Sequence, residues 1–272
     1  MFTVIISSTR KMRIFIKKLR RGIALTLIFS PVIAWTAELT NADAVLNFAM
    51  AQEASFDSFT ASLDEAVNLP TRQMQLTGAI AFKRPGRMRM EVTSPGQHSL
   101  MVVGLDRILW QEIAGGGQVR VLKLDWQNVP TNFPTAAKLK ESFSRLNPQT
   151  QLAKAREKYI FKLLPATQLD GQWMYVLLGE QRPEVRLDRQ QGPVSVHTGK
   201  FFIGQQDGFM YRIEEYADVS SAAVLSVKFS NLKLNPALAD DLFVYRPALD
   251  ANVVDLSQML RKIMNRPATL DH

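Results

Sequence analysis

The chain has 272 residues and no cysteine, with 33 basic and 25 acidic side chains. The basic excess lies at the start: residues 1–37 contain seven basic side chains and no acidic one, which leaves 26 basic and 25 acidic side chains after them. Net charge therefore gives no basis for nucleic-acid binding by residues 38–272. Without cysteine, the chain has no disulfide and no cysteine for lipid attachment.

The first segment has the layout of a secretory signal peptide. Residues 12–21 are rich in lysine and arginine, an apolar run follows over 22–34, and small residues stand at Ala34, Thr36 and Ala37. Cleavage is expected near 34–37, and both Met1 and Met12 fit as the start. An uncleaved membrane anchor is the alternative, but the apolar run is shorter than the roughly 18 to 20 residues that a spanning helix needs. We therefore expect residues 38–272 to form one exported domain in the periplasm of a bacterium with two membranes.

The first half of this domain predicts a helix followed by a meander of strands. The helix is expected over 40–52 with Thr40 as its cap, and a strand follows over 55–66. Further strands are predicted at 72–83, 87–93, 98–103, 107–113 and 118–124. The spacing is typical of antiparallel neighbours.

The second half predicts one mid-chain helix and a second set of strands. The helix is expected over 134–146, with Leu139 and Phe143 on its apolar side. Strands are predicted at 158–164, 172–179, 194–197, 200–204, 209–216, 224–232 and 242–245. A terminal helix could follow over 253–264. Residues 182–200 have no assigned role.

Side-chain alternation separates an apolar face from a charged one. Met88 and Met90 share one parity, whereas Arg87 and Arg89 hold the other. Ten or eleven antiparallel strands must curl, because strand twist accumulates across a sheet. The expected fold class is mainly β (α+β): a single incomplete antiparallel barrel with a helical lid over an apolar cavity. A packed core would show the same alternation, and parity does not say which face points inward.

Two sets of residues carry a family resemblance. The first is Phe56-x-x-Phe59-x-Ala61-x-Leu63, then Gly78-x-Ile80-x-Phe82-Lys83-Arg84-Pro85-Gly86-Arg87-Met88-Arg89-Met90, followed by Pro95, Leu109-Trp110 and Gln118-Val119. The second is Phe209-Met210-Tyr211-Arg212-Ile213 after Asp207-Gly208, with Phe229-x-Asn231 and Phe243-x-x-x-Pro247. Together they resemble the periplasmic outer-membrane lipoprotein carriers, the LolA-like family. The chain departs from the pattern at 104–107 and at Met90, where an aromatic residue is common.

The resemblance implies a carrier that binds lipoprotein acyl chains, or another acylated lipid, and moves them from the inner to the outer membrane. It implies an inner-membrane ABC-type release complex and an outer-membrane acceptor as partners. It also implies that Arg84 holds the lid shut; the alternative is a solvated arginine at a strand end. The expected cavity wall comprises Ile80, Phe82, Met88, Met90, Met101 and Val103, and the expected lid residues are Leu139 and Phe143. A non-catalytic sensor of lipid or lipoprotein on the same fold is the alternative function.

Catalytic groups are not predicted. The histidines His98, His197 and His272 do not form a metal-spaced pair. Adjacent carboxylates such as Asp64 and Glu65 point to opposite faces of a strand, so they do not form an acid and base pair. The expectation is a monomer that is not an enzyme and that uses no cofactor, metal or nucleic acid.

Overall fold

The computed structural model describes residues 39–69, 72–128, 148–187, 196–217 and 222–264, which belong to one compact unit, Leu39–His272. Three predicted segments lie outside the described residues: the signal peptide at 1–37, the lid helix at 134–146 and residues 194–195 of a strand. No helix within these described ranges is long and apolar enough to cross a membrane.

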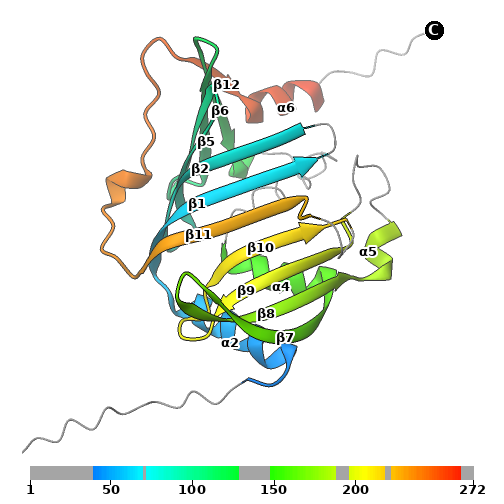
Figure 1. Ribbon diagram of the computed structural model, residues 1–272. Coiled ribbons are helices and arrows are strands. Elements are labelled where there is room, and N and C mark those ends of the chain that lie inside the picture. Colours follow the sequence, from blue (N-terminus) through cyan, green and yellow to red (C-terminus); the bar gives the residue numbers. More distant parts are fainter. Residues whose placement is uncertain (1–38, 70–71, 129–147, 188–195, 218–221, 265–272) are drawn as a thin grey trace, which may run out of the picture. The chain divides into compact units, whose positions relative to one another are not determined.

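Twelve strands in the described residues form a single sheet (Figure 1). Its order is β12-β6-β5-β4-β3-β2-β1-β11-β10-β9-β8-β7. The first six strands are β1 (Ser58–Leu69), β2 (Arg72–Lys83), β3 (Arg87–Ser94), β4 (Gln97–Val103), β5 (Ile108–Gly115) and β6 (Gln118–Asp125). The others are β7 (Tyr159–Leu169), β8 (Gln172–Gln181), β9 (Thr198–Gly204), β10 (Met210–Tyr216), β11 (Leu225–Leu234) and β12 (Asn252–Asp255).

The sheet is open, because its two edge strands β7 and β12 do not pair with each other. Its neighbours are antiparallel except for β12, which pairs with β6 in parallel. Figure 1 shows the twist: β5 and β6 are seen nearly edge-on, whereas β1, β11 and β10 are seen face-on. The predicted incomplete antiparallel barrel is confirmed, with twelve strands in place of ten or eleven and with one parallel edge pair that the prediction lacked.

Two helices pack against one end of this sheet. Helix α2 (Ala42–Ser55) begins at the N-cap Asn41, whose side-chain oxygen accepts a hydrogen bond from the Ala44 amide, so the prediction of Thr40 as the cap was wrong. Helix α4 (Pro148–Lys158) was not predicted, because Leu152 and Ala155 give its sequence only a narrow apolar side. Both helices pack in one apolar cluster with β7, β8 and β9.

The chain after β11 forms a segment that we call the strap (residues 235–251). It crosses the outer face of the sheet, which is the face opposite to the one that α2 and α4 cover. It contains the 3-10 helix η2 (Asp240–Phe243), so the strand predicted at 242–245 was wrong. Phe243 is buried because it packs against the sheet, and the ring of Tyr245 lies 5.4 Å from that of Trp110. The strap ends in β12, and helix α6 (Leu256–Met264) follows, so the first residues of the helix expected at 253–264 are strand instead.

Three shorter segments also differ from the prediction. Residues 196–197 are not strand, and β9 starts at Thr198. The short 3-10 helix η1 (Trp126–Asn128) follows β6, and helix α5 (Pro183–Leu187) follows β8. Neither was predicted.

Candidate functional site

Strand register places the six predicted wall residues on one face of the sheet. Phe82 is opposite Met88, and Met88 is opposite Val103. Ile80 is opposite Met90, which is opposite Met101. Directly paired residues point to the same side, so all six side chains share a face, which we call the inner face. They also belong to a single apolar cluster, in which Met90 and Val103 are only partly buried.

The inner face continues across the sheet to the helices. Leu63 on β1 is opposite Phe229, and Val227 on the same strand as Phe229 is opposite Ile213. Ile213 is in turn opposite Phe201, which belongs to the cluster that holds α2 and α4. Helices α2 and α4 therefore cover the inner face at its β7 to β9 end.

Burial changes along the strands of this face. On β1, Phe59, Ala61 and Leu63 are buried, whereas Val67 and Leu69 are half-buried. The same change occurs on neighbouring strands, where the half-buried apolar residues are Met74, Leu76, Val92, Ile113, Leu122, Leu225 and Val227. One end of the inner face is thus packed, and the other presents apolar side chains that the folded chain leaves partly accessible.

Arg84 lies where the β2–β3 turn meets the end of α2. Its Nε donates to the Phe56 carbonyl oxygen at 2.6 Å, and its Nη2 donates to the carbonyl oxygens of Glu53 at 2.9 Å and Ala54 at 3.0 Å. The last carbonyls of a helix have no partner within the helix and carry its negative dipole end, so a guanidinium is well suited to them. The predicted lid residues Leu139 and Phe143 lie outside the described residues, and a role of Arg84 in closing the lid stays a prediction.

The carboxyl group of Glu53 lies in the same region. Burial raises its pKa from 4.5 to about 8, although the positive charge of Arg84 acts in the opposite direction. A carboxylate at a helix C-terminus is disfavoured by the dipole as well. Glu53 therefore adds a titratable group to the contact between α2 and the β2–β3 turn.

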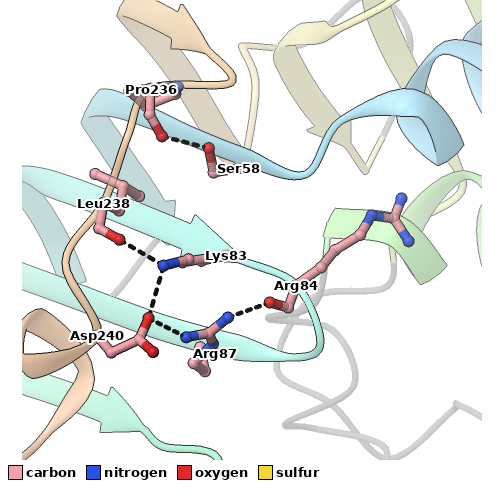
Figure 2. A network of polar contacts seen from close by, with 7 residues as sticks. All are labelled: Ser58, Lys83, Arg84, Arg87, Pro236, Leu238 and Asp240. Atoms are coloured by element: carbon pink, nitrogen blue, oxygen red, sulfur yellow. Dashed lines mark hydrogen bonds and ion pairs between the residues drawn. The ribbon is translucent and has the colours of Figure 1, made fainter.

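A polar network fastens the strap beside this contact (Figure 2). Lys83 Nζ donates to Asp240 Oδ1 at 2.6 Å and to the Leu238 carbonyl oxygen at 2.5 Å. Arg87, which is buried, donates to Asp240 at 2.5 Å and to the Arg84 carbonyl oxygen. Figure 2 shows the guanidinium of Arg84 pointing away from this network. The turn thus has two partners: Lys83 and Arg87 at its two ends hold the strap, and the side chain of Arg84 between them holds α2.

An open groove of about 740 Å³ lies between these contacts. It is lined by Asp57, Ser58, Lys83, Arg84 and residues 235–239. Ser58 Oγ closes one side by donating to the Pro236 carbonyl oxygen at 2.7 Å.

Two carboxyl groups on the inner face were missed by the sequence analysis. Glu65 is opposite Leu76 and Val227, and Glu215 is opposite Leu225. Glu215 accepts hydrogen bonds from Lys158 Nζ at 3.4 Å and from the Tyr159 hydroxyl at 3.3 Å. The sequence does contain the signal for Glu65, which has the same parity as Leu63 and Val67.

Metal-binding groups are not apparent in the described part of the chain, where no three candidate ligands converge. His98 contacts Glu91 at 3.0 Å, two strand residues on the outer face.

No protein-family model matches the chain, and no curated protein matches its sequence. Solved structures do match. An uncharacterized conserved protein from Thermus thermophilus has a TM-score of 0.49 and 11% identity over 78% of this chain and 98% of the other. The lipoprotein LppX of Mycobacterium tuberculosis has a TM-score of 0.45 and 13% identity over 73% and 99%. A LolA superfamily protein from Nitrosomonas europaea has a TM-score of 0.30 and 16% identity over 76% and 99%. A LolA superfamily protein is thus among the structures similar to this chain.

Proposed function

We propose that the mature protein is a periplasmic carrier that binds the acyl chains of a lipoprotein, or of another acylated lipid, on the inner face of its sheet and moves them from the inner to the outer membrane. The observation that supports this most is the continuous inner face, packed at one end and half-buried at the other. A contiguous group of partly accessible apolar side chains on one face is typical of a binding surface, whereas single exposed apolar residues are not.

The physical demand on such a carrier is large. A lipoprotein anchor with about 45 methylenes would cost on the order of 30 kcal/mol to expose to water, at roughly 0.8 kcal/mol per methylene. The carrier must therefore replace the bilayer with apolar surface. Met74, Met90 and Met101 contribute flexible, unbranched side chains to the inner face, and such side chains adapt to acyl chains in variable positions.

Release of the ligand requires that the cover of the inner face can open at a modest cost in free energy. The end of α2 is held by three hydrogen bonds from one side chain, Arg84. A contact of this size can shift between two arrangements that differ by a few kcal/mol. Arg84 is therefore the residue that we assign to closure, through α2 as well as through the expected lid at 134–146.

A two-step vesicle assay tests the proposal. The mature protein is incubated with donor vesicles that contain a fluorescent diacylated peptide, separated from them, and mixed with acceptor vesicles. A carrier takes up the peptide and delivers it to the acceptor. Uptake without delivery would favour the lipid or lipoprotein sensor, and failure of uptake from every donor would overturn acyl-chain binding altogether.

A further inference from the structure

The inner face carries a carboxyl group at the point where its burial changes. Along β1, Glu65 follows buried Leu63 and precedes half-buried Val67 on the same face. Its neighbours across the two adjacent strands are Leu76 and Val227. The carboxyl group is therefore surrounded by apolar side chains on β1, β2 and β11.

Glu65 makes no hydrogen bond or ion pair with any residue that the structure describes. Glu215, the other carboxyl group on this face, has both Lys158 and Tyr159 as partners. Burial raises the pKa of Glu65 above its ordinary value. A desolvated carboxylate without a partner is unfavourable, so this position costs stability in the empty protein and favours any ligand that supplies a positive donor.

The distance along β1 suits an amphiphilic ligand. From Phe59 at the packed end to Glu65 the strand covers about 20 Å, at roughly 3.3 Å per residue. One leaflet of a bilayer has a hydrocarbon thickness of about 15 Å. Phe59, Ala61 and Leu63 are buried in the empty protein, so an acyl chain reaches them only when the cover of the inner face opens. Its head group would then lie near Glu65, at the half-buried end of the inner face.

We propose that Glu65 binds a primary ammonium group located next to the acyl chains of the ligand, and so selects ligands that carry one. The inference rests on the proposed function, because it assumes that acyl chains occupy the inner face. An ammonium is favoured over a hydroxyl group because it offers three donors and a full positive charge, and charge-assisted hydrogen bonds are about twice as strong as neutral ones. Two sources share this chemistry: an aminophospholipid and a diacylglyceryl peptide with a free α-amine.

The test compares two lipids with identical acyl chains. Vesicles of phosphatidylethanolamine and phosphatidylglycerol in equal amounts are incubated with the protein, and the extracted lipids are measured by mass spectrometry. The wild type should be enriched about tenfold in phosphatidylethanolamine, as expected for one charge-assisted contact. In E65Q the ratio should fall to about one. The matched control is D64N, because exposed Asp64 lies next to Glu65 on the opposite face, and it should keep the wild-type ratio.

A second arm distinguishes the two sources. A diacylglyceryl peptide with a free α-amine is compared with the same peptide N-acetylated, in wild type and E65Q. If the wild type prefers the free amine and E65Q does not, the peptide is a source of the ammonium group. If the preference is seen only between the two phospholipids, the phospholipid is the source. Equal binding in both arms, or an unchanged preference in E65Q, would overturn the inference while leaving the proposed function intact. If the wild type extracts no acylated ligand at all, the proposed function itself fails.

E65Q is expected to fold, since it removes a desolvated charge and keeps the size of the side chain. Thermal unfolding of E65Q should occur at or above the wild-type temperature. A lower unfolding temperature would mean that Glu65 has a structural partner, and this would also contradict the inference.

Discussion

Arg84 donates through its guanidinium to the Glu53 carbonyl oxygen at 2.9 Å, across the gap between the β2–β3 turn and the end of α2. Further hydrogen bonds to Ala54 and Phe56 make this one side chain the principal polar contact of the helix end among the described residues. The contact joins residues 28 to 31 positions apart, so it fixes α2 to the β2–β3 turn and not merely to the short segment between α2 and β1.

Replacing Arg84 should loosen the end of α2. Arg84→Leu removes all three hydrogen bonds, each of which is worth about 1 kcal/mol or more because the donor is charged. Amide hydrogen exchange in residues 50–56 should accelerate by about tenfold or more. R84K should give an intermediate result, since lysine keeps the charge but loses the planar fork. The control is R89Q, because Arg89 lies on the outer face next to Glu91. Exchange that stays as slow in R84L as in R89Q would contradict the assignment.

Glu53 should make stability depend on pH. The folded protein keeps the proton on Glu53 up to about pH 8, whereas the unfolded chain loses it above pH 4.5. Its stabilising contribution is thus present below pH 4.5 and is lost as the pH rises toward 8. E53Q stays neutral, so the wild type should lose on the order of 1–2 kcal/mol relative to E53Q across this range, after allowance for partial exposure. Denaturant unfolding of both proteins measures the difference, and a pH-independent difference would show that Glu53 titrates normally.

Met90→Glu tests whether the inner face binds acyl chains. Met90 is half-buried, so the variant can fold, whereas the same change at buried Met88 would bury a charge and destabilise the protein. The new carboxylate should lower acyl-peptide uptake by about tenfold or more, because it must be desolvated against the chain. R89E places the same charge one residue away on the outer face and should bind normally. Equal uptake by M90E and R89E would remove Met90 from the binding surface.

Asp240 should link strap docking to pH. Hydrogen bonds from Lys83, and then from Arg87, lower its pKa below 3.8, so its stabilising contribution is present above that pH and is lost as the pH falls. D240N leaves buried Arg87 without its anionic partner, and it should be less stable than the wild type at neutral pH. The two proteins should converge in acid. Urea unfolding at neutral and acidic pH checks this, and equal stability at neutral pH would show that Asp240 does not contribute to holding the strap.

The sequence predicted the parts of the fold that depend on local alternation. The parity of Ile80, Phe82, Met88 and Met90 predicted that they share a face, and the strand register in the structure places them on one face. A strand residue can change faces only by a shift of the whole strand. The contact that holds the end of α2 could not be predicted in this way. Its partner is Arg84, and no periodic pattern connects a helix end with a turn so far along the chain.

The remaining differences have similar causes. Phe243 is buried and aromatic and so resembles a strand residue, yet it lies in a 3-10 helix that packs on the outer face. The parallel pair of β12 with β6 joins residues more than a hundred positions apart, such as Val254 and Leu122, and depends on the path of the strap. Glu65 was overlooked because parity identifies its face but does not reveal whether another side chain pairs with it; among the residues that the structure describes, none does.

Native mass spectrometry of the protein purified from its native source shows whether the inner face holds acyl chains. We expect a complex with about one acylated lipid or lipoprotein per protein, and lipid extraction should identify the ligand. A protein that is purified without lipid and takes up no acylated peptide afterwards would contradict the account, and the inner face would then be the surface of a packed core.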